Sequence, residues 1–162
     1  MEVLLYSAAN KAAINDLCGR FGLSIHPLAA EDEIPGSWFG PPEAGLIGST
    51  LYIRPDTPVH SLLHEGCHYI CMDAERRMNL DTNAGGDYDE ENGVCYLQIL
   101  LAGHIQGMGQ DRMMQDMDCW GYTFRLGSAK AWFEQDAEDA QQWLQQHGLI
   151  DENDKPTWMC RS

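Results

Sequence analysis

Two histidines four residues apart, His64 and His68, constrain this chain more than any other feature of its sequence. Residues 58–72 are predicted to form one helix, because Thr57 suits an N-cap and Pro58 suits the first helical position. A spacing of four places both imidazoles on one helix face, about one turn apart, so both can reach one ion. Zinc accepts neutral imidazole nitrogens, and the segment therefore predicts a helix that supplies two zinc ligands.

Glu65 follows the first histidine and is expected to lie beside the ion without binding it. A carboxylate in that position can take a proton from water that the metal has acidified and later pass it to a leaving amine. The run His64-Glu65-Gly66-Cys67-His68 matches the H-E-x-x-H pattern of zinc-dependent peptidases. Glu65 is therefore the candidate general base.

A catalytic zinc site needs a third ligand from the protein. A histidine six residues after His68 is excluded, because Ala74 occupies that position. The remaining source is a carboxylate from a second helix, which an acidic run at residues 89–91 is predicted to open. Glu90 is the preferred ligand, because Gly93, three residues further on, would leave space for the metal-binding helix. The alternatives are Glu91 and, after it, Asp87 and Asp89.

Residues 45–102 resemble the core of gluzincin peptidases, in particular the ImmA/IrrE-like group of small cytoplasmic zincins. The resemblance starts with residues 51–53 and with Leu62 and Leu63 before the histidine motif. It continues in the second helix with Glu90, Gly93, Tyr96, Leu100 and Leu101. Residues 94–98 also resemble a stretch of uncharacterised bacterial proteins. The resemblance implies a zincin-like fold and peptidase activity with Zn²⁺ as cofactor.

The predicted elements indicate an α+β fold, in which a small twisted sheet packs on several helices and the metal lies between two of them. Strands are predicted at residues 3–6, 23–27, 46–48 and 51–53, and helices at 8–21, 58–72, 89–103, 110–120 and 128–147. Without a linker or a repeat, residues 1–162 are expected to form one zincin-like domain. Its metal core spans about 45–102, and its C-terminal helices span about 108–147.

Four further side chains are candidates for a place beside the metal or in its cleft: His60, Cys67, Tyr122 and Trp38. His60 is expected on the surface, with a place near the ligands as the alternative. Cys67 is expected to be a small buried hydrophobe. We expect Trp38 to cap the core, the alternative being a cleft, and Tyr122 to pack, the alternative being a role at an oxyanion.

The chain carries a net charge of -15 at pH 7. Such a surface repels phosphates, so nucleic acid and anionic membranes are not expected partners, whereas a basic peptide or protein is compatible. No signal peptide and no run of eighteen apolar residues is found, so a cytoplasmic protein with reduced cysteines is expected. Nothing in the sequence indicates an oligomeric state.

The sequence therefore predicts a zinc-dependent peptidase, with metal-activated water and Glu65 as general base. A peptide or protein substrate would pair its backbone with residues 51–53, expected to be an edge strand. The alternative is a non-catalytic regulatory or interaction protein whose zinc stabilises the fold. A third interpretation is a metal-free helical protein in which the motif occurs by chance.

Overall fold

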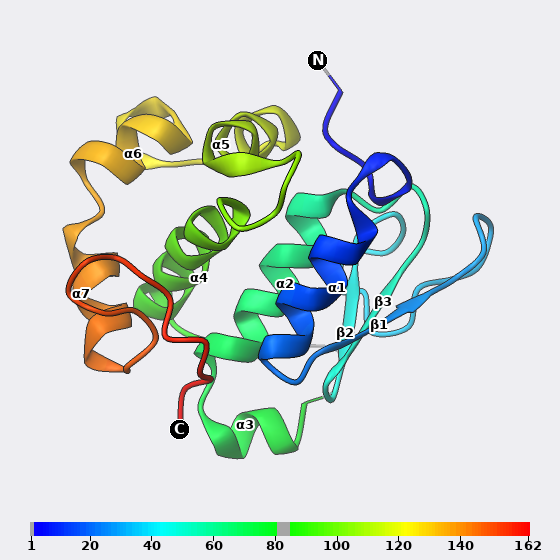
Figure 1. The fold of residues 1–162 in the computed structure, drawn as a ribbon, viewed down its shortest axis with the longest axis horizontal. Helices are drawn as coiled ribbons and strands as arrows, with labels where there is room; N and C mark the ends of the chain where they lie inside the picture. Colours follow the sequence, from blue (N-terminus) through cyan, green and yellow to red (C-terminus); the bar gives the residue numbers. More distant parts are fainter. Residues whose placement is uncertain (1, 81–84) are drawn as a thin grey trace.

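A computed structural model describes residues 2–80 and 85–162. It has an α+β architecture with a small mixed sheet at one side and helices at the other (Figure 1). The helices are η1 (Tyr6–Ala8), α1 (Lys11–Arg20), α2 (Val59–Cys71), α3 (Ala74–Met78), α4 (Tyr88–Ala102), α5 (Gly109–Trp120), η2 (Arg125–Gly127), α6 (Ala129–Gln135) and α7 (Glu138–Gln146). The strands are β1 (Ser24–Pro27), β2 (Gly45–Ile47) and β3 (Thr50–Ile53).

Strand β3 is the middle strand of the sheet, whose order is β1-β3-β2. It pairs in parallel with β1 and antiparallel with β2. Leu51 and Ile53 are fully buried and alternate with partly exposed neighbours, as the two-residue period of a strand requires. Because both edges of β3 are already paired, the prediction that residues 51–53 form an edge strand open to a substrate backbone is wrong.

Helix α2 lies between the sheet and α4, and most of its residues are buried (Figure 1). On one side it contacts β2 and β3, and on the other it contacts α4. A helix enclosed in this way is apolar around most of its circumference. Its polar side chains must then find partners on the neighbouring elements, because an unpaired buried polar group is destabilising.

Helix α4 is the second central helix, and it contacts α2, α5 and α7. Its N-cap is Asp87, whose side chain accepts a hydrogen bond from the backbone N–H of Glu90 at 2.9 Å. An acidic residue at this position also complements the helix dipole. Within residues 2–80 and 85–162, every helix is too short or too polar to span a membrane.

The strands predicted at 23–27, 46–48 and 51–53 are confirmed, as are the helices at 58–72, 89–103 and 110–120, to within one or two residues. The helix predicted at 8–21 begins later, because the Asn10 side chain caps it by accepting from Ala13 N–H. Thr57 does not cap α2; its hydroxyl accepts from the backbone N–H of Arg54 at 2.8 Å.

Three further predictions need correction. Residues 3–6 form no strand, and Leu5 makes only an isolated bridge to Pro58. The single helix predicted at 128–147 is two helices, α6 and α7, because the backbone leaves the helical conformation at Asp136. Helix α3 lies in a polar stretch for which no helix was predicted, and the Asp73 side chain caps it by accepting from Arg76 N–H.

Candidate metal centre

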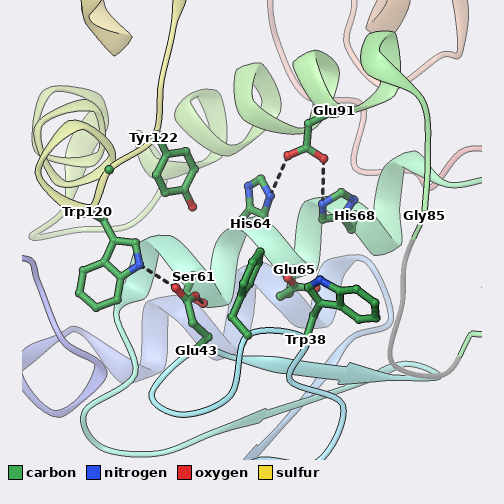
Figure 2. Close-up of a pocket in the computed structure, with 12 residues that line it drawn as sticks. Trp38, Glu43, Ser61, His64, Glu65, His68, Gly85, Glu91, Trp120 and Tyr122 are labelled. Carbon is green, nitrogen blue, oxygen red and sulfur yellow. Dashed lines mark hydrogen bonds and ion pairs between the residues drawn. The ribbon is translucent and has the colours of Figure 1, made fainter.

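Both histidines of the motif on α2 converge on one carboxylate from α4. His64 Nε2 lies 3.1 Å from Glu91 Oε1, and His68 Nε2 lies 3.1 Å from Glu91 Oε2 (Figure 2). One ligand atom from each of the three residues lies within 4.8 Å of the others. Ligand atoms about 2.0–2.1 Å from a tetrahedral zinc ion are about 3.3 Å apart. Two imidazoles and one carboxylate are thus positioned as zinc ligands would be.

The preferred third ligand, Glu90, takes no part in this cluster. Its carboxylate is buried and accepts two hydrogen bonds from Arg76, at 2.9 and 2.7 Å. Arg161 adds a third contact at 3.1 Å. The preference for Glu90 is therefore corrected to Glu91, which sequence analysis held as the alternative. Asp87 is engaged as the helix cap, and the side chain of Asp89 is exposed.

The Glu90 side chain points away from α2 because its face of α4 packs against another helix, α7. Adjacent residues on a helix point about 100° apart, and Gly93 lies three residues from Glu90 on the same face. A Cβ at Gly93 would lie 2.7 Å from Cε3 of Trp143 on α7. The glycine therefore makes room for α7 and not for α2, and the side of α4 that faces α2 begins with Glu91.

Gln98 fixes the orientation of the first metal-binding histidine. Its Nε2 donates to the backbone carbonyl of His60 at 2.9 Å, and a carbonyl oxygen can only accept. The amide oxygen therefore faces His64 Nδ1, 2.9 Å away, which must carry the hydrogen. When Nδ1 is the donor, Nε2 of a neutral imidazole has a free lone pair for a metal.

Sequence analysis overlooked Gln98, although a signal was present. It is the only polar residue in the apolar part of α4, and it is fully buried. It lies seven residues after Glu91, which is two helical turns along the same face. A lone amide at that spacing from a candidate ligand indicates a partner for a ligating histidine.

Glu65 lies in the cleft beside the three clustered side chains (Figure 2). Burial raises the pKa of its carboxyl, and the neighbouring histidines His68 and His64 partly offset that rise. The shift brings the pKa of this carboxyl closer to neutral pH, which suits a general base. For Glu91 burial acts in the same direction, but hydrogen bonds from His64 and His68 hold its pKa well below the usual value. Glu91 therefore stays anionic, as a ligand must.

His60 is fully buried, contrary to the expectation of a surface position. Its Nδ1 lies 3.2 Å from the hydroxyl of Tyr122, which reaches the site from the segment after α5. Burial lowers the pKa of His60 to about 4 and raises the pKa of Tyr122 to about 12. At neutral pH the pair therefore consists of an uncharged imidazole and a protonated phenol. The Tyr122 ring lies 5.6 Å from that of His64.

Trp38 and Phe39 do not cap the core. The two residues are 62% and 78% exposed, and both line the cleft of about 480 Å³ that contains the candidate site. Cys67 is fully buried, and burial raises the pKa of its thiol well above the usual value. This confirms its prediction as a small buried hydrophobe. The other residues that line the cleft are Glu43, Ser61, Gly85, Trp120, Gly121 and Tyr122.

Comparison of the chain with protein-family models, with curated proteins and with solved structures gave no significant match. The gluzincin resemblance therefore stays an expectation drawn from the motif. The geometry around His64, His68 and Glu91 is what supports a function.

Proposed function

We propose that this chain is a zinc-dependent peptidase, in which His64, His68 and Glu91 hold the metal and Glu65 is the general base. The observation that carries the proposal is the approach of Nε2 of both histidines to the two oxygens of Glu91, each at 3.1 Å. The donor set of two histidines and one glutamate is that of known catalytic zinc sites, in which a fourth position stays open. The metal core would then be gluzincin-like.

The ligands are positioned for a divalent cation. The hydrogen bond from His64 Nδ1 to Gln98 would leave Nε2 to bind the cation, which would displace the proton that Nε2 shares with Glu91. When bound, a zinc ion supplies Lewis acidity, which lowers the pKa of water towards about 7 and polarises a substrate carbonyl. The anionic Glu91 offsets part of the charge of the cation.

The remaining residues supply proton transfer and a hydrogen-bond donor. Glu65 accepts a proton from the attacking water and returns it to the leaving amine, as its raised pKa favours. Tyr122, kept protonated by burial, can donate to an oxygen that gains negative charge during the reaction. His60 positions this phenol through the contact of its Nδ1 with the hydroxyl. These are the roles that hydrolysis of a peptide bond requires.

Metal content is the first test. Protein purified without a chelator should contain about one zinc per chain by elemental analysis. Glu91→Gln should lower the zinc content, whereas Glu90→Gln should retain it, because Glu90 pairs with arginines instead. If the unmodified protein binds no zinc, the metal-free interpretation is correct and the proposal fails.

Turnover is the second test, measured with a library of quenched fluorescent peptides. The unmodified zinc-loaded chain should cleave part of the library. Glu65→Gln should keep its zinc and lose at least about 100-fold in rate, the effect of removing a general base. Zinc binding without cleavage of any library peptide by the unmodified chain would instead favour the non-catalytic alternative.

A further inference from the structure

A second carboxylate in the cleft has no part in the proposed hydrolysis. Glu43 lies in the segment just before β2, and its Oε1 accepts a hydrogen bond from Trp120 Nε1 at 2.6 Å (Figure 2). Its Oε2 accepts from the hydroxyl of Ser61 on α2. Both residues that hold the carboxylate also line the cleft. Glu43 therefore connects the loop, α2 and the end of α5 at one point.

The position of this carboxylate is closely fixed. Ser61 Oγ accepts from the backbone N–H of Ala44 at 3.0 Å, so its single proton is left for Glu43. The Ser37 hydroxyl donates to the backbone carbonyl of Glu43 at 3.0 Å. Ser61 lies four residues before Glu65 on α2, which is about 6 Å along the helix. Glu43 is thus held by a residue of α2 that lies about one helical turn from the candidate general base.

In the described part of the chain, Glu43 has no positively charged partner. Both groups that donate to its carboxylate are neutral, and within residues 2–80 and 85–162 no lysine, arginine or histidine forms an ion pair with it. Among the residues that the structure describes, the cleft lining includes no lysine or arginine, whereas Glu43 and Glu65 both line it. A partly buried carboxylate without a counter-charge favours a cation that can enter the cleft.

The walls beside Glu43 are aromatic. The Trp120 indole is held by its hydrogen bond to Glu43, and its ring lies 5.1 Å from that of His60. Trp120 is 40% exposed, and the more exposed Trp38 and Phe39 line the same cleft. Aromatic faces attract ammonium and guanidinium groups through the ring quadrupole. Carboxylate and rings thus favour the same kind of ligand.

We infer that Glu43, Trp120, Trp38 and Phe39 form a subsite for a positively charged group of the substrate. This inference rests on the proposed function, because it names the substrate class of the same cleft. The charge comes from a lysine or arginine side chain or from the α-ammonium of a peptide. The spacing of about 6 Å along α2 between Ser61, which holds Glu43, and Glu65 corresponds to about two residues of extended peptide. The charged group therefore belongs to a residue close to the bond that is cleaved.

The test measures binding, so that it does not depend on turnover. Zinc-loaded Glu65→Gln protein is titrated with acetylated alanine hexapeptides that carry one lysine at each position in turn, followed by tryptophan fluorescence. Matched peptides carry norleucine in place of lysine, or norleucine with a free α-amine. At least one charged peptide should bind about tenfold or more tightly than its neutral match. Whether the lysine or the free-amine set shows the gain identifies the source of the charge.

Adding Glu43→Gln should abolish this difference, because glutamine has no charge but keeps the size of the side chain, with an amide oxygen that can accept from Trp120 and an amide N–H that can donate to Ser61 Oγ. Glu134→Gln removes one charge from the exposed surface of α6 and is the matched control. This variant should keep the difference in affinity between charged and neutral peptides. Equal binding of charged and neutral peptides to the protein with Glu43 intact would overturn the inference, and this comparison does not depend on the folding of the Glu43→Gln variant. A preference for charged peptides that persists in the Glu43→Gln variant would also overturn the inference.

The outcomes separate this inference from the proposed function. Charge-selective binding without cleavage by the unmodified chain would sustain the subsite and overturn the peptidase proposal. Cleavage of the quenched library by the unmodified chain, with equal binding of charged and neutral hexapeptides, would sustain the peptidase and overturn the subsite.

Discussion

Two adjacent glutamates on α4 show how one helix can serve stability on one face and chemistry on another. The side chain of Glu90 is 3% exposed and is paired with Arg76 and Arg161. The side chain of Glu91 is 49% exposed and lies against the imidazoles of His64 and His68. A carboxylate neutralised by two guanidinium groups has little capacity for a metal, whereas one that faces imidazoles keeps it. The partners, more than the residue type, decide the role.

Glu90→Gln should give the largest effect on stability. Removal of the acid leaves two arginine charges beside a buried amide, and breaking a buried pair costs about 3–5 kcal/mol. Because both arginines remain partly exposed, we expect a loss of about 3 kcal/mol in the free energy of unfolding, measured by urea denaturation. Glu91→Gln in chelator-treated protein should lose about 1 kcal/mol or less. Equal losses for the two variants would contradict the contrast between the faces.

Gln98→Leu tests the face of α4 that is directed at α2. Without the amide, His64 Nδ1 loses the acceptor that sets its tautomer. Loss of such a supporting partner weakens metal affinity by about 10–100-fold, which is about 1.4–2.7 kcal/mol. Competition with a chromophoric chelator would measure this. Gln141→Leu on α7, where the amide donates to Asp154, should leave zinc affinity unchanged.

The buried His60, whose carbonyl anchors Gln98, should make stability depend on pH. Its pKa is about 4 in the folded protein, against about 6.5 unfolded. Between pH 6.5 and pH 4, His60 is protonated in the unfolded chain but stays neutral in the folded chain. The free energy of unfolding that this residue contributes above pH 6.5 is therefore lost as the pH falls towards 4.

For His60 alone we expect a loss of about 2 kcal/mol between pH 7 and pH 5. The measurement is urea denaturation at both pH values with a chelator present, for the unmodified chain and for His60→Gln. The loss should be smaller by this amount in the variant. The same pH dependence in both proteins would show that His60 does not remain neutral when folded.

Gly93→Ala should give the smallest effect, on the face of α4 that packs against α7. The new Cβ would press on the Trp143 ring, and such overpacking costs about 1–3 kcal/mol. We expect the lower part of this range, by thermal denaturation, with zinc affinity unchanged. Gly19→Ala is the matched control in α1, because nothing lies within 4 Å of its Cβ position. That change should be neutral or stabilising by up to about 1 kcal/mol.

Local patterns predicted the parts of the site that lie on one element. The spacing of His64 and His68 was sufficient to place two imidazoles on one helix face, and the acidic run was sufficient to start the second helix. The choice between Glu90 and Glu91 was not local, because it depends on how α7 packs against Gly93 some fifty residues earlier. Local patterns could not predict the contact between Glu43 and Trp120 either, because these residues are 77 positions apart in the chain.

Burial was the other quantity that single-sequence patterns misjudged. His60 was expected on the surface and Trp38 in the core, and the structure has both the other way round. His60 becomes buried because the segment after α5 brings Tyr122 against it. Trp38 stays exposed because its loop borders the cleft. Both outcomes depend on contacts between distant segments, which residue type alone does not specify.

The contact of Arg161 with Glu90 has a consequence for the order in which the protein matures. Arg161 also binds the end of α2, through its backbone N–H to Ile70 O at 2.9 Å and its guanidinium to Cys71 O at 3.2 Å. Chains are synthesised from the N-terminus, so α2 and α4 leave the ribosome long before residue 161 does. The contact that Arg161 makes between the end of α2 and Glu90 on α4 therefore forms only after both helices have been synthesised.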